Sequence, residues 1–233
     1  MGRQIKGLLY FFIADVRYSL AIFWTILMGI LVVTLTVAYF LNNVENGFMT
    51  LSLTGPMYVY CAILGFITVK ESIPFSIKMG ATRKNFFISL GLFFLGLSLV
   101  KAVAASIIQI LVDLLNAKAG IDTFMFLHLT YFTDDTWYTR IFIDTSIMFL
   151  SFSALFVIGL LFYKYGLAGG GSVVGVIVIL MLIGLAQGWL IDFFIDIFQS
   201  IDMMLFGKLL VLGIVIYSFS MTLLRRITIV KAK

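Results

Sequence analysis

The chain has 233 residues, of which 62% are hydrophobic and only 12% are charged. A soluble domain carries about a quarter charged residues, so this composition, with a mean hydropathy of +1.15, excludes an ordinary soluble protein. The net charge of +5 does not indicate nucleic-acid binding here, because the charges lie in short segments between apolar runs. Cys61, the single cysteine, excludes an internal disulfide and a cysteine-based metal cluster.

The N-terminal segment, residues 1–18, predicts an amphipathic helix. Its basic and small or aromatic positions recur at spacings of three and four residues and therefore share one helical face: Arg3, Lys6, Tyr10, Ala14 and Arg17. Such a basic helix lies in the headgroup layer of a membrane. We expect an interfacial, cytoplasmic connecting helix; the alternative is a positive anchor that only fixes the topology.

Six apolar runs follow, close to the roughly 20 residues that a membrane-spanning helix needs. They are Leu20–Leu41, Leu51–Val69, Asn85–Ile108, Thr145–Tyr163, Tyr165–Ile191 and Leu209–Leu224. The sequence therefore predicts an all-α membrane protein with six transmembrane helices. These form one six-helix transmembrane domain, residues 19–226, followed by a tail, residues 227–233.

The basic residues orient the predicted spans. Most of the 16 Lys and Arg fall in segments on one side: Arg3, Lys6, Arg17, Lys70, Lys78, Arg83, Lys84, Lys164, Arg225, Arg226, Lys231 and Lys233. The opposite segments hold only Lys118, Arg140 and Lys208. Cytoplasmic loops carry the excess of Lys and Arg, so we expect both termini to be cytoplasmic.

The segment between the fifth and sixth runs, Asp192–Phe206, has a different character. Asp192, Asp196 and Gln199 share a helical face, whereas Phe193 and Phe194 are apolar. It is too acidic to cross the bilayer and too apolar for a free loop. We expect a short helix or re-entrant element at the outer surface.

Motifs for catalysis or nucleotide binding are missing from the sequence. There is no G-x-x-x-x-G-K-[ST] run to hold phosphates, and His128 is the only histidine, so a histidine metal site has no second ligand of its kind. We expect no enzymatic activity, no metal and no cofactor in this chain. The spacing Gly171-x-x-x-Gly175 favours close helix packing instead.

Lys101 is the one ionisable residue well inside a predicted span. A lysine at the centre of a membrane helix costs roughly 2.5–3.5 kcal/mol unless it pairs or snorkels. Asp144 should lie at a comparable depth in the next span, so we predict an intramembrane Lys101–Asp144 pair. The alternative is that Lys101 snorkels to the outer headgroups.

The segment Lys70–Asn85, between the second and third runs, is longer and more apolar than a simple connection requires. Pro74 can begin a helical turn, and apolar side chains alternate with charges. We expect a short helix along the membrane surface that docks into a groove on a partner protein. A basic loop that only sets the topology is the alternative.

The run Gly80-Ala81-Thr82-Arg83-Lys84-Asn85-Phe86-Phe87 resembles the G-x-[ST]-R-K-x-F stretch of small bacterial ABC-2-type permeases. The resemblance implies a connecting helix (Gln4–Tyr18), a coupling helix (Glu71–Met79) and a re-entrant element (Asp192–Phe206). It also implies a separate ATPase subunit that binds ATP and Mg, and a second permease subunit, identical or related. The implied location is the bacterial cytoplasmic membrane, among its lipids.

The function expected from this resemblance is that of the membrane subunit of an ATP-driven exporter of amphipathic or lipophilic substrates. Permeases that export antimicrobial or toxin peptides, including the phenol-soluble-modulin exporter, are similar. The residues expected to couple to the ATPase are Glu71, Phe75, Lys78, Met79 and Arg83. Two alternatives are a six-span substrate-binding component of a vitamin importer and an accessory membrane protein without transport activity.

Overall fold

The structure is a computed structural model that describes residues 2–42, 44 and 47–225. The expected tail, residues 227–233, and the basic residues within it lie outside this part. The helices are α1 (Gly2–Leu41), α2 (Thr54–Lys78), α3 (Arg83–Ala119), α4 (Trp137–Gln187), α5 (Trp189–Gln199) and α6 (Met203–Arg225). Two short strands, β1 (Met49–Leu51) and β2 (Phe124–Phe126), and a 3₁₀ turn, η1 (Leu129–Phe132), complete the described elements.

Five of these helices, all except α5, are long and apolar enough to cross a membrane. By length and composition the chain is therefore a helical membrane protein, as the hydropathy of the sequence indicates. α4 is divided at Gly166, whose φ of 71° and ψ of −172° break the helical path. Only glycine adopts such a conformation without strain. The segments 137–165 and 167–187 correspond to the fourth and fifth predicted spans.

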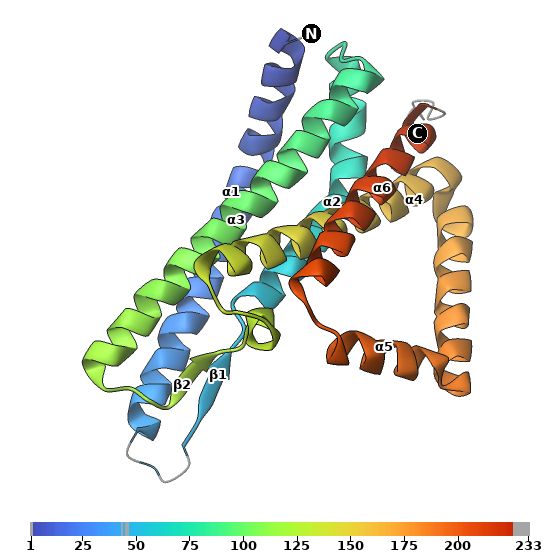
Figure 1. Cartoon of the computed structure of the whole chain (residues 1–233). Coiled ribbons are helices and arrows are strands. Elements are labelled where there is room, and N and C mark those ends of the chain that lie inside the picture. The colour runs from blue at the N-terminus through green and yellow to red at the C-terminus, as the bar shows by residue number, and fades with distance from the viewer. Residues whose placement is uncertain (1, 43, 45–46, 226–233) are drawn as a thin grey trace.

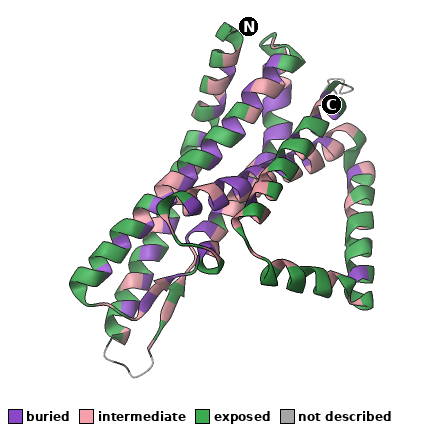
Figure 2. Ribbon diagram, viewed as in Figure 1, coloured by how far each residue is buried: buried purple, intermediate pink, exposed green. Residues whose placement is uncertain are grey.

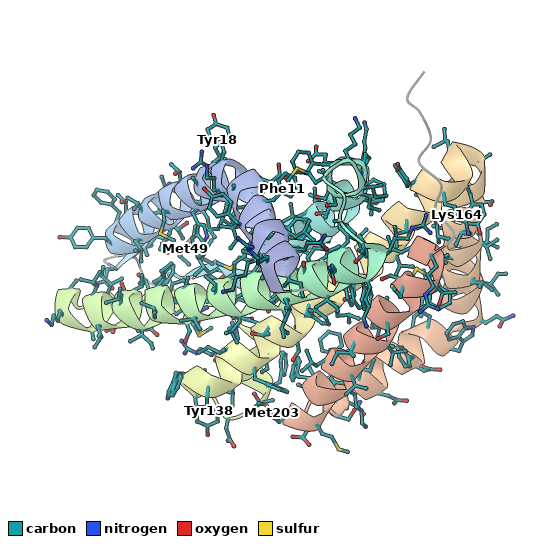
Figure 3. The ribbon with its side chains drawn as sticks, turned by 90° about the horizontal axis from the view of Figure 1, so that it is seen from above. Phe11, Tyr18, Met49, Tyr138, Lys164 and Met203 are labelled. Carbon is teal, nitrogen blue, oxygen red and sulfur yellow. The ribbon has the colours of Figure 1, made fainter. Side chains whose placement is uncertain are left out.

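α1 passes without a break through residue 18, where the sequence places the end of a separate interfacial helix. Its axis changes direction near Tyr18, and its N-terminal part lies across α3 (Figure 3). Leu8, Phe12 and Val16 in that part are buried. These three apolar residues of the amphipathic segment therefore pack against the protein itself.

The expected separate helix Glu71–Met79 is wrong, because residues up to Lys78 are the last turns of α2. Pro74 lies inside α2, where it removes a single backbone donor. The buried face of the helix continues through Thr68, Ser72 and Ser76, so tertiary packing extends α2 past the proline. Gly80, at φ 74°, then reverses the chain into α3.

The opposite end of the molecule carries the two strands (Figure 1). They pair in parallel, with Met49 opposite Phe124. Thr123 Oγ1 donates to the carbonyl oxygen of Ala38 at 2.7 Å, and Asn42 Nδ2 donates to the carbonyl oxygen of Gly120 at 2.8 Å. The sequence predicts neither the strand pair nor these two hydrogen bonds. Together they join the end of α1 to the segment after α3.

The core lies where α2, α3, α4 and α6 meet. Phe94 of α3 stacks on Phe152 of α4 with ring centroids 4.5 Å apart, and its edge contacts Phe156. Two glycines allow the backbones of α2 and α4 to approach closely: a Cβ on Gly65 would stand 2.6 Å from the Phe152 carbonyl oxygen, and one on Gly159 would stand 2.9 Å from that of Phe66.

The second part of α4 and all of α5 stand apart from this core (Figures 1 and 2). α5 has no buried residue. The expected outer element Asp192–Phe206 is divided in the structure, because α5 ends at Gln199 and residues from Met203 onwards belong to α6. The position of α5 relative to a membrane stays a prediction.

Candidate functional site

The end of α2 and the start of α3 form a projecting turn, which we call the α2–α3 tip, residues 71–86. It lies at the same end of the molecule as the N-terminus and the described end of α6 (Figure 1). Thr82 begins α3 as its N-cap, and its side chain accepts a hydrogen bond from the backbone N–H of Asn85 at 3.2 Å. A cap of this kind fixes where the helix starts, so the tip is a defined turn.

α1 is attached to this tip by aromatic and polar contacts. Phe11 stacks on Phe75 with ring centroids 4.1 Å apart and planes within 15°. Phe12 contacts the edge of Phe86 at 5.9 Å. Asn85 Nδ2 donates a hydrogen bond to the side-chain oxygen of Gln4. The tip and the N-terminal part of α1 are therefore held together by both apolar burial and a polar link.

α6 reaches the tip from the other side. Arg83 donates a hydrogen bond from its guanidinium to the carbonyl oxygen of Arg225, in the last turn of α6. A shallow, largely apolar hollow lies between the tip and α6. It is lined by Ile73, Ile77, Ala81, Arg83, Phe86 and Leu224. The cation at the C-terminal end of α6 also suits the partial negative charge there. A displacement of the tip would thus act directly on α1 and α6.

The residues that the sequence predicts for ATPase coupling all lie exposed at this tip. Phe75 is 39% exposed and Met79 is 67% exposed. The charged residues of the tip beside them are Glu71, Lys78 and Arg83. One face of Phe75 is occupied by Phe11, which the sequence does not reveal. The sequence also does not predict the hydrogen bond between Gln4 and Asn85. The one indication is that each is a polar residue on an otherwise apolar helical face.

The predicted Lys101–Asp144 pair does not form. Asp144 is buried and its Oδ1 accepts hydrogen bonds from the Tyr58 hydroxyl at 2.5 Å and from His128 Nε2 at 3.1 Å. The backbone N–H of Thr130 donates to His128 Nδ1 at 3.1 Å, so the ring proton resides on Nε2. Equal depth in two spans does not determine which residues two side chains meet, and here Lys101 and Asp144 have different neighbours.

Lys101 is enclosed elsewhere, between α1, α2 and α3. Its Nζ lies 3.9 Å from the ring centroid of Tyr60 and 4.4 Å from that of Phe23. The residue is 1% exposed, and its Nζ has no hydrogen-bond partner among the described residues. It therefore does not snorkel to either surface, as the alternative interpretation would require.

At the strand end, Arg140 organises a polar cluster. Its guanidinium donates to both carboxylate oxygens of Asp135 at 2.6 Å and to the side-chain oxygen of Gln109 at 3.1 Å. The bidentate bond to Arg140 lowers the pKa of Asp135 in the loop before α4. In the described part of the chain, no group of three His, Cys, Asp or Glu residues is arranged to hold a metal ion.

This pair predicts a pH-dependent contribution to stability. Because the pKa of Asp135 is lower in the folded chain, the contribution is fully present above the ordinary carboxyl pKa of about 3.9 and is lost as the pH falls through the lowered value. We expect the difference in thermal midpoint between the unmodified chain and Asp135→Asn to be small, as for exposed pairs, and to shrink below about pH 4. A difference that grows on acidification would contradict this assignment.

Comparison of the chain with protein-family models, curated proteins and solved structures finds no match.

Proposed function

We propose that this chain is the membrane-spanning permease subunit of an ATP-driven exporter that moves amphipathic or lipophilic substrates, such as antimicrobial or toxin peptides, out of a bacterial cell. A separate ATPase subunit binds ATP and Mg and docks on the α2–α3 tip. Six crossing segments, with both termini cytoplasmic, place this tip on the side of the ATPase. A second permease subunit, identical or related, completes the pathway.

The observation that carries the proposal is the surface of the tip. Met79 and one face of Phe75 are exposed beside Glu71, Lys78 and Arg83. Apolar anchors within a charged rim are the usual composition of a protein-binding patch. The position after the second long helix and the Gly80–Phe87 run match what the ABC-2-type resemblance implies for an ATPase contact.

The contacts of the tip support a mechanical role. Phe75 is stacked on Phe11 of α1, and Arg83 is bonded to the end of α6. A partner that closes on nucleotide binding would therefore displace the ends of α1, α3 and α6 together. Rigid elements that rock between two packings are a common way for such a push to open a pathway. The nearly uncharged helices suit lipophilic substrates.

Met79→Ser tests the docking role, because Met79 is the most exposed apolar residue of the tip and no aromatic contact to α1 depends on it. We expect affinity purification of the unmodified chain in mild detergent to retain an ATPase subunit. Met79→Ser should weaken that association about tenfold or more, as for an interface anchor. Leu167→Ser, at an 83% exposed apolar position after the α4 kink, is the matched control and should change nothing.

Two outcomes would count against the proposal in different ways. If the unmodified chain retains no ATPase, the assigned function is wrong. If the ATPase is retained equally by the unmodified chain and by Met79→Ser, the function stands and the docking surface is elsewhere.

A further inference from the structure

The buried ammonium group of Lys101 lacks an oxygen or nitrogen acceptor among the described residues. An ammonium group offers three N–H donors and no acceptor, and among the described residues no oxygen or nitrogen atom accepts from them, the thiol of Cys61 being the polar neighbour. The two aromatic rings offer only a cation–π attraction, about 0.5–2 kcal/mol. The rings therefore offset only part of the cost of burying this charge, and no carboxylate among the described residues pairs with it.

Neighbouring groups do not supply the missing anion. Tyr60 is held in place by a hydrogen bond from its hydroxyl to Ser19 Oγ at 3.2 Å. Cys61 is the other polar group that interacts with Lys101. Asp144, the buried carboxylate of the next helix, is bonded to Tyr58 and His128. Because ionisable side chains inside membrane spans ordinarily mark substrate or ion sites, an external anion is the natural partner.

The parts of α1 and α3 that precede Phe23 and Lys101 form an apolar groove. It has a volume of about 380 Å³ and lies between α1 and α3, and its lining residues include Leu9, Ile13, Leu20, Leu92, Phe93 and Val100. The next residues along both helices enclose the charge, since Phe23 follows Leu20 by one turn and Lys101 follows Val100. Arg17 also lines the groove, between Ile13 and Leu20 on α1.

We propose that Lys101 binds the carboxylate of a single-chain amphiphile whose alkyl chain lies in the α1–α3 groove. Phe23 follows the groove residue Leu20 on α1 and its ring covers the ammonium, so we expect this ring to move aside for the carboxylate to form its charge-assisted hydrogen bonds. Without the ligand, the rings of Phe23 and Tyr60 cover the charge. This site needs no ATPase and would stand if the proposed function failed.

Trp24 provides a local reporter. It neighbours Phe23, with ring centroids 6.2 Å apart, and the chain has only three tryptophans. In a Trp137→Phe, Trp189→Phe background, Trp24 is the single fluorophore. 6-Bromoundecanoic acid, whose mid-chain bromine lies within reach of Trp24 when the carboxylate is at Lys101, is the quenching probe, and 6-bromoundecan-1-ol is its uncharged counterpart at the same mole fraction in the micelle.

We expect the acid to quench Trp24 saturably, with half-saturation at a concentration at least tenfold below that of the alcohol. Lys101→Met should remove this preference and Lys101→Arg should keep it. Arg17→Met should leave it unchanged. The comparison of acid with alcohol on the chain with native Lys101 does not depend on whether any Lys101 variant folds.

Equal quenching by the acid and the alcohol would overturn the proposal. It would also be overturned if Arg17→Met, and not Lys101→Met, removed the preference for the acid, because Arg17 would then be the ligand of the carboxylate. A preference that survives in Lys101→Met, in protein of unchanged size-exclusion profile, would exclude Lys101 as the anion ligand.

Discussion

Asp144→Ala should lower the free energy of unfolding by about 3–5 kcal/mol, the range for removing one partner from a buried charged group. Asp144 is 1% exposed, and its carboxylate is the acceptor for both the Tyr58 hydroxyl and His128 Nε2. Its removal leaves these two donors in the interior without an acceptor. Each unsatisfied buried donor costs about 1–3 kcal/mol.

Thermal unfolding in a fixed detergent, followed by circular dichroism or by a thiol-reactive dye on buried Cys61, measures this effect. Asp144→Asn retains an acceptor oxygen and should cost less than Asp144→Ala. Asp192→Ala, at an exposed acidic position of α5, is the control and should leave the midpoint within experimental error. Equal midpoints for Asp144→Ala and Asp192→Ala would mean that the Tyr58–Asp144–His128 cluster does not stabilise the fold.

Gly65→Ala should destabilise the chain by about 1–3 kcal/mol, the usual cost of overpacking. The added Cβ would meet the Phe152 carbonyl oxygen at 2.6 Å and its Cα at 3.1 Å. Both atoms belong to the backbone of α4, so the contact is relieved only by separating α2 from α4. That separation would loosen the core around Phe94 and Phe152.

The same substitution at Gly29 is the matched control and should act in the opposite direction. A Cβ there would meet nothing within 4 Å, and alanine favours a helix over glycine by up to about 1 kcal/mol. Gly29→Ala should therefore be neutral or stabilising, whereas Gly65→Ala lowers the thermal midpoint. Similar shifts of the same sign at both positions would contradict the close α2–α4 crossing.

Several parts of the fold follow from local sequence. The long apolar runs predict helices because each helix satisfies its backbone within itself, which a membrane interior requires. The kink at Gly166 lies two residues after Lys164, which separates the fourth and fifth predicted spans, and the reversal at Gly80 directly follows the expected helix Glu71–Met79. Only tertiary contacts extend α2 through Pro74 and α1 past residue 18.

For the candidate site, too, the sequence predicts some features and only the tertiary structure decides the others. The sequence identifies an exposed, charged and apolar turn at Glu71–Arg83, because composition reveals it. It does not reveal that Phe75 faces Phe11, or that Arg83 is bonded to the end of α6, since the partners are far apart in the chain. The predicted pair of Lys101 and Asp144 rests on their similar depth in the membrane. That depth does not fix the direction in which a side chain leaves its helix.

By itself, the sequence determined that this is a helical membrane protein and which turn concentrates charge, because these properties depend on residues close together in the chain. The tertiary structure decided which buried polar groups meet. It brings Asp144 to His128 and Tyr58, and it leaves Lys101 under two aromatic rings without an acceptor among the described residues. The physical reason is that a helix fixes the spacing of its own side chains, whereas their neighbours depend on how whole helices rotate and pack against one another.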